Sequence, residues 1–509
     1  MGSDKRLSRL CLIAFAFLLA LFGFVGFRST TSESDIIQGE VRDANGPVED
    51  ALVRIKGQAD ATHTDSNGRF RLAKRGADAE TITAWKDGYL IGSGVAKRER
   101  IRIDLRRLPV EDNASYSWVD PTPSRTSKNN CGNCHAEMHG EWAMSGHAAA
   151  ATNQHFLSLY EGTDYQGKRS VGWSLRDEYP DGVGVCTACH APTVPHGDPA
   201  YFDLGKVQGV ARQGVHCDYC HKIADAGLGT IGLTHGRFGL QLLRPAEEQL
   251  FFGPLDDVDR GEDAFSPLYK QSRYCASCHE GTVFGVHVYG TYSEWLASPA
   301  RKHGKQCQTC HMRPTGLMTN FAPEHGGIER DPKTLANHYF FASSQLDMLR
   351  HALHVSVRFD GGKAERRLSV EVRADDVGHR VPTGFVDRHL VLIVEALGVA
   401  GKRIALSDGP TLPQQAGSSI ASLSGRIYGR ILKGDGGNWP VPFWRADEEM
   451  TEDTRLKPGE SDHLQFTVPT QVQRVRVRML YRRTWPEVAE AKGWPDNEMV
   501  IVDQFHEAP

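Results

Sequence analysis

The sequence has almost no cysteine to spare and no excess of charge of one sign. Ten of its 11 cysteines fall in pairs separated by two residues, and only Cys11 lies outside them. A disulfide scaffold is therefore excluded, because such close thiols would form small strained loops. The 59 Lys and Arg nearly balance the 63 Asp and Glu, giving a formal net charge of −4. This balance excludes the basic footprint of a nucleic-acid-binding protein, and no nucleic-acid partner is expected.

A single stretch is apolar enough to cross a membrane. Residues Leu10 to Phe27 hold no charged side chain, and three basic residues precede them: Lys5, Arg6 and Arg9. The pattern predicts a transmembrane helix within residues 1–30, with its N-terminal tip in the cytoplasm. A cleavable signal peptide is the alternative, but Gly26-Phe27-Arg28-Ser29 makes a poor cleavage site, so an anchor is favoured. Either one predicts export to the periplasm, and an anchor predicts a single-pass protein of the bacterial inner membrane.

Each of the five cysteine pairs is followed at once by a histidine. The five C-x-x-C-H motifs are Cys131/Cys134/His135, Cys186/Cys189/His190, Cys217/Cys220/His221, Cys275/Cys278/His279 and Cys307/Cys310/His311. This is the attachment signature of a c-type haem. The two thiols form thioethers to one porphyrin, and the histidine becomes the proximal ligand of its iron. Zinc would instead pair the motifs two by two and would not require a histidine in each. The sequence therefore predicts five covalently bound haem c groups.

The spacing of the motifs and the remaining histidines bear on how the haems are arranged. Two pairs of motifs are close in sequence, Cys186 with Cys217 and Cys275 with Cys307, and we expect each pair to bring two haems nearly into contact. The sixth iron ligand separates electron carriers from catalysts. The distal candidates are His147 and His338, and the weaker ones are His196, His303, His235 and His325. His216, next to Cys217, could serve only a neighbouring haem. Met144 and Met312 are expected to fill core gaps.

Hydrophobic patterning predicts a multidomain chain. Residues 36–108 alternate apolar and polar side chains between turns, which predicts a small β-sandwich. Residues 112–345 hold all five motifs and predict a haem-dense domain of short helices and irregular chain. Alternation returns over 350–509, for example in Leu353-His-Val-Ser-Val-Arg-Phe359, and predicts a second β-sandwich. Within it, the Gly- and Ser-rich stretch 409–437 is expected to form long loops.

Two segments resemble known families. Gly39-x-Val41-x-Asp43, Thr64-Asp65-x-x-Gly68-x-Phe70 and Gly88-Tyr89 resemble the carboxypeptidase regulatory-like module, which implies a sandwich without catalytic duty. Glu141-Trp142-x-x-Ser145-x-His147 and the third to fifth motifs with their flanking residues resemble the cytochrome c-554-like multihaem cytochromes, relatives of hydroxylamine oxidoreductase. That resemblance implies bis-His electron-transfer haems stacked in close pairs. It also implies that the loop Gly378-His379-Arg-Val-Pro382-Thr383-Gly384 lends His379 to a haem.

These observations favour a membrane-anchored, periplasm-facing pentahaem cytochrome that relays electrons between redox partner proteins. The alternative is an enzyme in which one haem lacks a sixth ligand and acts on a small nitrogen or sulfur compound. All five motifs end in histidine, so the lysine-ligated haem of pentahaem nitrite reductases is absent. A non-enzymatic electron-transfer protein is therefore favoured, and no catalytic residue is assigned.

Overall fold

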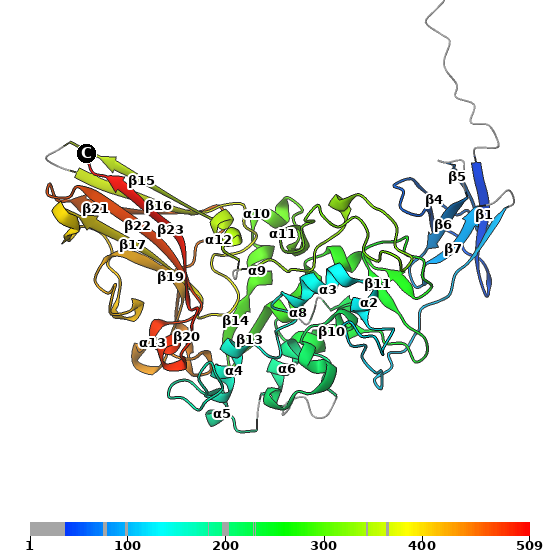
Figure 1. Cartoon of the computed structure of the whole chain (residues 1–509), viewed down its shortest axis with the longest axis horizontal. Helices are drawn as coiled ribbons and strands as arrows, with labels where there is room; N and C mark the ends of the chain where they lie inside the picture. Colours follow the sequence, from blue (N-terminus) through cyan, green and yellow to red (C-terminus); the bar gives the residue numbers. More distant parts are fainter. Residues whose placement is uncertain are drawn as a thin grey trace, which may run out of the picture. The chain divides into compact units, whose positions relative to one another are not determined.

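The chain forms two compact units in the computed structural model. The structure describes residues 36–509 except 75–78, 97–99, 182, 196–202, 228, 230, 343–344 and 363–365. The two units are Met1–Arg107 and Leu108–Pro509 (Figure 1). The predicted membrane helix at 10–27 lies outside the described residues, and no helix within them combines the length and hydropathy that a bilayer crossing needs.

The first unit is a β-sandwich with its own core. Alternation in the first strand buries Ile37 and Val41 on one face, and these side chains meet Val53, Ile82 and Ile103 between two sheets. One sheet has the order β2-β1-β5, with β8 also paired to β1, and the other has the order β4-β3-β6-β7. The strands are β1 (Ile36–Asp43), β2 (Gly46–Pro47), β3 (Leu52–Ile55), β4 (Ala61–His63), β5 (Arg69–Ala73), β6 (Glu80–Trp85), β7 (Gly92–Ala96) and β8 (Ile101–Asp104).

Each C-x-x-C-H motif in the second unit forms a short helix or ends one. The five are α2 (Cys131–Cys134), α6 (Gly184–His190), α7 (Cys217–Cys220), α8 (Arg273–His279) and α11 (Cys307–His311). Residues three and four apart share one face of a helix. The two cysteines and the following histidine of a motif stand at such spacings, so helix formation directs all three groups to one side.

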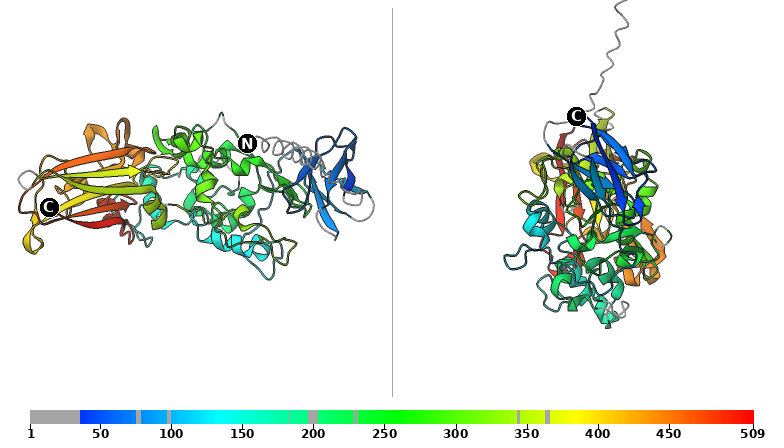
Figure 2. Two further views of the ribbon diagram at one scale, coloured as in Figure 1. Left: turned by 90° about the horizontal axis from the view of Figure 1, so that it is seen from above. Right: turned by 90° about the vertical axis from the view of Figure 1, so that its right-hand side faces the viewer.

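The chain between these helices consists of other short elements. The helices are α3 (Ala136–Ala143), α4 (Gln154–Glu161), α5 (Leu175–Glu178), α9 (Thr291–Leu296), α10 (Pro299–Lys302) and α12 (Leu346–Ala352), with 3-10 turns η3 (Leu204–Lys206), η4 (Gly209–Gln213), η6 (Gly236–Gly239), η7 (Pro267–Lys270) and η8 (Pro332–Thr334). The strands pair as β9 (Ile223–Ala226) with β10 (Leu240–Leu242), β11 (Phe251–Gly253) with β12 (Asp263–Phe265), and β13 (Glu280–Val283) with β14 (Val286–Gly290). Figure 2 shows these pieces turned in many directions, in contrast to the aligned strands of the C-terminal region.

The C-terminal region is a sandwich of two antiparallel sheets. The smaller sheet has the order β15-β16-β21 and the larger the order β20-β19-β17-β22-β23, with β18 on β17. The strands are β15 (Leu353–Asp360), β16 (Arg366–Ala374), β17 (His389–Leu397), β18 (Arg403–Ile404), β19 (Ser424–Lys433), β20 (Asp447–Asp453), β21 (Ser461–Val468), β22 (Arg474–Arg482) and β23 (Glu498–Glu507). The helical pieces are α13 (Pro486–Lys492), η9 (Val399–Gly401), η10 (Gln414–Ala416), η11 (Asp435–Gly437) and η12 (Phe443–Arg445).

The outer face of the larger sheet shares its core with the motif-bearing region. Strand β17 is buried on both faces. Leu390 and Leu392 pack between the two sheets, whereas Val391 and Ile393 pack with Leu159 of α4. Further contacts join Val286 and Val288 of β14 to Val386 of the β16–β17 loop. The sandwich therefore forms one wall of the motif-bearing region rather than a separate appendage.

The expectation of long loops over 409–437 is wrong in part, because residues 424–433 form the strand β19. Glycine content suggested a loop, but Gly425 and Gly429 let β19 approach β17 closely. A Cβ atom on Gly425 would lie 2.0 Å from the Leu392 carbonyl oxygen, and one on Gly429 would lie 2.8 Å from the His389 Cβ atom. The glycines thus mark close packing of two strands.

Candidate haem sites

Four of the five motif histidines are held by a backbone carbonyl. The Nδ1 atom of His135 contacts the Phe321 oxygen at 2.8 Å, that of His190 the Ala150 oxygen at 2.8 Å, that of His221 the Phe252 oxygen at 2.6 Å, and that of His311 the Phe341 oxygen. An Nδ1–H donor to a carbonyl fixes the tautomer and orients the ring, which leaves Nε2 for a metal. This is the arrangement that a proximal iron ligand requires.

Two motif histidines face a second histidine at the spacing of a shared metal. The ring centres of His147 and His279 are 6.2 Å apart, and those of His311 and His379 are 6.1 Å apart. Metal–imidazole bonds are about 2 Å long, so two rings on opposite sides of one metal ion have centres about 6 Å apart. The Nδ1 atom of His379 contacts the Arg380 oxygen at 3.0 Å, which leaves Nε2 of that ring available. Both pairs therefore fit a bis-His iron.

His338 and His147 hold nitrogen atoms that are buried without a partner. Their Nδ1 atoms have no hydrogen bond among the described residues. Burial lowers the pKa of both rings to about 3, so both stay neutral, which is the form that binds a metal. His338 is close enough to His221 and His135 for their charges to lower its pKa further. It therefore lies between the first and third motifs.

The second motif lines a largely apolar cavity. Cys186, Cys189 and His190 are on its wall together with His235, and aromatic rings cover much of the remainder: Phe156, Tyr160, Tyr289, Phe385, Phe443 and Trp444. The Phe156 ring stacks on His190 with ring centres 4.1 Å apart. Gly281 gives His235 room, because a Cβ atom there would lie 2.5 Å from its Nδ1 atom. The apolar and aromatic lining suits a small-molecule cofactor.

The other predicted ligands lie elsewhere. His196 is outside the described residues, and His303 is exposed at the end of α10. His325 is exposed. Burial of His135 is the main cause of the lowered pKa of that ring, and the charge of His325 lowers it further. Both ring nitrogens of His216 are engaged, Nε2 with Thr193 at 3.3 Å and Nδ1 as acceptor from the Tyr219 N–H at 3.5 Å. Met144 is 71% exposed, so the expectation that it fills a gap in the core is wrong.

Thiols of different motifs touch one another. Cys131 lies beside Cys217, Cys189 beside Cys278, and Cys275 beside Cys307. The predicted closeness of Cys275 and Cys307 is thus present. Cys217, however, contacts Cys131 rather than Cys186, because the chain folds the first motif back onto the third. All ten motif cysteines are free of disulfides.

Two tyrosines connect the third motif to the fourth. Tyr274, which precedes Cys275 in α8, donates from its hydroxyl to the Cys220 carbonyl oxygen at 2.9 Å, and Tyr269 donates to the same oxygen at 2.6 Å. With the thiol contacts, this gives a continuous row of motifs: first, third, fourth and fifth, with the second beside the fourth.

A buried ion pair holds the third motif in place. Asp218 and Lys222 are both fully buried, with the Lys222 Nζ atom 2.5 Å from the Asp218 Oδ1 atom. The Asp218 carboxylate also accepts two hydrogen bonds, one from the Tyr116 hydroxyl at 3.0 Å and one from the Val119 N–H at 2.8 Å. Burial lowers the pKa of Lys222, and the partner carboxylate opposes that change. The segment that leads into the second unit is therefore fixed to the helix of this motif.

Comparisons with known proteins agree with this geometry. Residues 130–222, which hold the first three motifs, match the family model of cytochrome c554 and c-prime. The fold is similar to the crystal structure of a penta-heme cytochrome c552 from Thermochromatium tepidum, with a TM-score of 0.53 and 22% sequence identity. That match covers 75% of this chain and 99% of the other. No curated protein matches the chain by sequence. The chain thus has a multihaem cytochrome c fold with β-rich regions, which confirms that part of the sequence prediction.

Sequence reasoning missed how the haem sites are built from distant residues. Phe156 on His190 and His235 beside the second motif come from α4 and from the turn before η6. No local pattern marks either residue, since each stands in ordinary polar and apolar surroundings. Gly281 was the available signal, because a glycine within a strand often marks a close approach.

Proposed function

We propose that the protein is a membrane-anchored, periplasm-facing cytochrome that relays electrons through five haem c groups. The observation that supports this most directly is the arrangement of the C-x-x-C-H helices. Thiol contacts join the first motif to the third, the second to the fourth and the fourth to the fifth, and two tyrosines join the third to the fourth. Such contacts put the attachment points of neighbouring haems side by side. Covalently bound iron porphyrin supplies one-electron chemistry, and close spacing lets electrons pass along the row.

The five motif histidines are the proposed proximal ligands, and four other histidines are proposed as distal ligands. His147 is the distal ligand of the fourth haem, because its ring centre lies 6.2 Å from that of His279. His379 is the distal ligand of the fifth haem, because its ring centre lies 6.1 Å from that of His311. His235 serves the second haem, because it lines the same cavity as His190. His338 serves the first or the third haem. Backbone carbonyls on the proximal Nδ1 atoms hold four of these rings in orientation.

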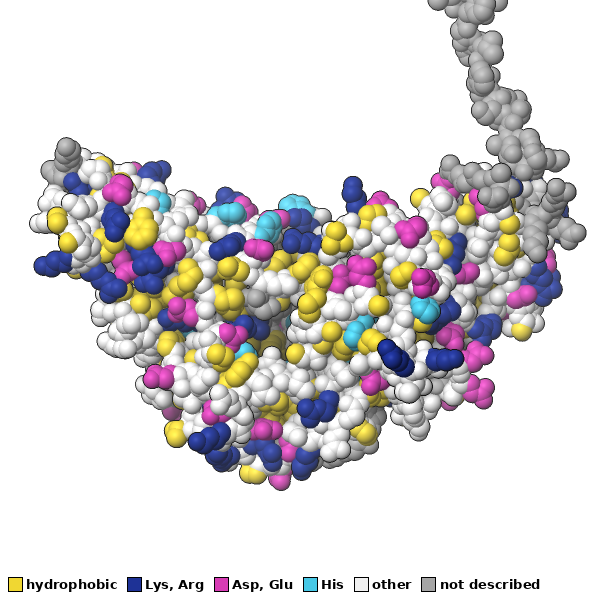
Figure 3. Space-filling model, in the orientation of Figure 1, with side chains coloured by type: hydrophobic (Ala, Val, Ile, Leu, Met, Phe, Trp, Pro, Cys, Tyr) yellow, Lys and Arg dark blue, Asp and Glu magenta, His cyan; other side chains and the backbone are white. Residues whose placement is uncertain are grey.

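The remaining parts of the chain position this relay. An N-terminal helix at 10–27 would tether it to the inner membrane. This part of the proposal is based on the apolar run and the basic residues that precede it. The first sandwich, which resembles the carboxypeptidase regulatory-like module, would serve as a spacer or docking surface. Charges of both signs are interspersed over the face drawn in Figure 3, as expected for a protein that meets other redox proteins. A relation to hydroxylamine oxidoreductase remains part of this proposal.

The decisive experiment is intact-mass analysis of protein matured in a host competent for cytochrome c assembly. Five added haem masses on one polypeptide are expected. A Cys→Ala pair in one motif, such as Cys307→Ala with Cys310→Ala, should remove one haem mass. A wild-type count well below five would overturn the proposal. An oxidised spectrum with only low-spin bands would support a pure carrier.

One observation supports the alternative of an enzyme. His338 lies near both His135 and His221, yet one ring can ligate only one iron. The other iron would use another ligand, such as the exposed His325 near His135, or would offer an open position to a small nitrogen or sulfur compound. A high-spin band that cyanide or nitrite abolishes would favour this second function.

A further inference from the structure

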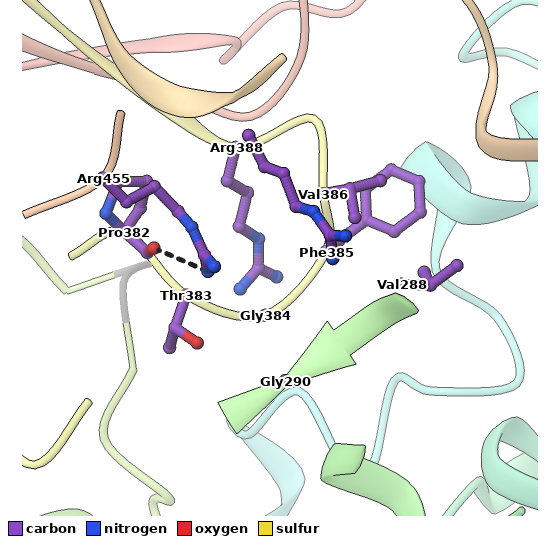
Figure 4. A pocket seen from close by; sticks show the side chains of 10 residues that line it. Val288, Gly290, Pro382, Thr383, Gly384, Phe385, Val386, Arg388 and Arg455 are labelled. Atoms are coloured by element: carbon purple, nitrogen blue, oxygen red, sulfur yellow. Dashed lines mark hydrogen bonds between the residues drawn. The ribbon is translucent and has the colours of Figure 1, made fainter. Parts of the chain in front are cut away.

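The loop between β16 and β17 forms a small arginine-lined pocket beside the haem sites. Figure 4 shows the loop segment Pro382–Val386 with Arg388 and Arg455 beside it. Arg430 also lines it. Val288 and Phe385 line both this pocket and the cavity of the second motif, so a single layer of side chains separates the two.

Two of the three arginines are already paired with carboxylates. Arg455 contacts Glu294 at 2.7 Å and Asp453 at 2.8 Å. Arg430 pairs with Glu448 and donates to the His287 carbonyl oxygen. For Arg388, in the part of the chain that the structure describes, neither a carboxylate partner nor a side-chain hydrogen bond is found. A half-buried guanidinium in a pocket is costly without an anion beside it.

Arg388 stands at the boundary of the second and fourth haem sites. Cys278 of the fourth motif lines the same cavity as His190 of the second motif, and Phe385 separates that cavity from the arginine-lined pocket. Tyr289 lines the second-motif cavity, and burial raises the pKa of its hydroxyl. The charge of Arg388 opposes that rise. Gly384 leaves space for the guanidinium, because a Cβ atom there would lie 2.6 Å from the Arg388 Nη1 atom. The guanidinium therefore packs closely against Gly384 of this loop.

We infer that Arg388 binds the carboxylate of a haem propionate where the second and fourth haem sites meet, and so sets the potential of that haem. This inference rests on the proposed function. Each haem c brings two carboxylates, and an arginine fork suits a carboxylate in two parallel hydrogen bonds. A fixed cation near an iron favours the ferrous state, whose net charge is less positive. Loss of the cation should therefore lower the potential of the nearby haem.

The test is spectroelectrochemistry of the full-length holoprotein with Arg388→Gln and Arg388→Lys. We expect Arg388→Gln to shift the midpoint potential of one haem downward while the other haems keep theirs, and Arg388→Lys to shift it less. Arg476→Gln is the matched control, because that arginine pairs with Asp503 at 2.6 Å on the same sandwich. If Arg388→Gln does not mature, Gly384→Ala displaces the guanidinium without removing it and should lower the same potential. Unchanged potentials, or an equal shift in the control, would overturn the inference.

A free anion is the other source of the same chemistry. In that case the wild-type potential would depend on added sulfate or nitrite, and Arg388→Gln would abolish the dependence, which would overturn binding of a propionate. A potential independent of added anions supports the propionate. Intact mass separates the two proposals: five haems with no shift in Arg388→Gln refutes only this inference, whereas fewer than five haems in the wild type refutes the proposed function.

Discussion

His379 belongs to the C-terminal sandwich region, yet its ring faces His311 of the fifth motif at 6.1 Å. Replacing it with alanine should leave five thioether-bound haems and convert one of them from low-spin to high-spin, because one iron loses its sixth ligand. Absorption and magnetic spectra of the oxidised protein would detect the change. His303→Ala is the control, since that side chain is exposed, and it should leave the spectra unaltered. A wholly low-spin His379→Ala protein would contradict the assignment.

Asp387 is a buried carboxyl in the same loop. Its exposed fraction is 2%, and its hydrogen-bond partner is the Thr484 hydroxyl at 3.2 Å. Burial raises its pKa from 3.8 to about 7. Folding thus favours the protonated form, so this contribution to stability is fully present below about pH 4 and is lost as the pH rises to about 7.

Asp387→Asn removes this dependence on pH. The variant should be more stable than the wild type at pH 8, by about 1–3 kcal/mol, the usual cost of a poorly paired buried polar group. At pH 5 the difference should be much smaller. Denaturant unfolding of the holoprotein at both pH values would measure it, and a difference that does not change with pH would show that the carboxyl does not titrate in this range.

How far single residues could be predicted depends on where their partners are. The ten cysteines and five histidines of the motifs are visible because thioether chemistry demands fixed local spacing. His147, His338 and His379 were also identified as candidates, but their partner haems follow only from three-dimensional proximity. His235 was rated low, since nothing near it in the sequence points to Gly281 or His190.

Strand β19 shows the limit of composition as a guide to elements. Its glycines suggested a loop, although Ile427, Tyr428, Ile431 and Leu432 supply enough buried apolar side chains for a central strand. The alternation in Leu353-His-Val-Ser-Val-Arg-Phe359 of the C-terminal sandwich, by contrast, correctly predicted the strand β15. Alternating apolar side chains can be recognised in a sequence. A glycine that lets two strands approach closely cannot be told from a loop glycine by composition alone.

Gly425→Ala tests this role of glycine within β19. A Cβ atom there would lie 2.0 Å from the Leu392 carbonyl oxygen, which is backbone and cannot move aside cheaply. We expect a loss of about 3 kcal/mol in unfolding free energy. Gly362→Ala is the control, because no heavy atom of the described residues, apart from its chain neighbours, lies within 4 Å of the position its Cβ would take. Equal stability of the two variants, measured by denaturant unfolding, would contradict close packing at this point.

The two units of the chain have separate cores, so they should fold separately. The first unit is built around Val41, Val53 and Ile82, whereas the haem-bearing unit begins at Leu108. A chain of residues 108–509 exported by a foreign signal peptide should retain five haems and the wild-type set of potentials. Intact mass and spectroelectrochemistry would check this. Loss of haems from that chain would mean that the first sandwich is needed for maturation.

Under the proposed ligation by His379, the last iron is tied to the fold around it. Because β16 and β17 flank the loop that supplies this ligand, coordination and folding of the sandwich are thermodynamically linked, and each must strengthen the other by the same free energy. An exogenous ligand that displaces His379 would thus loosen strands remote from the porphyrin. Conversely, a nascent chain cannot complete its final metal centre until the polypeptide beyond the motif has been exported and has closed over it.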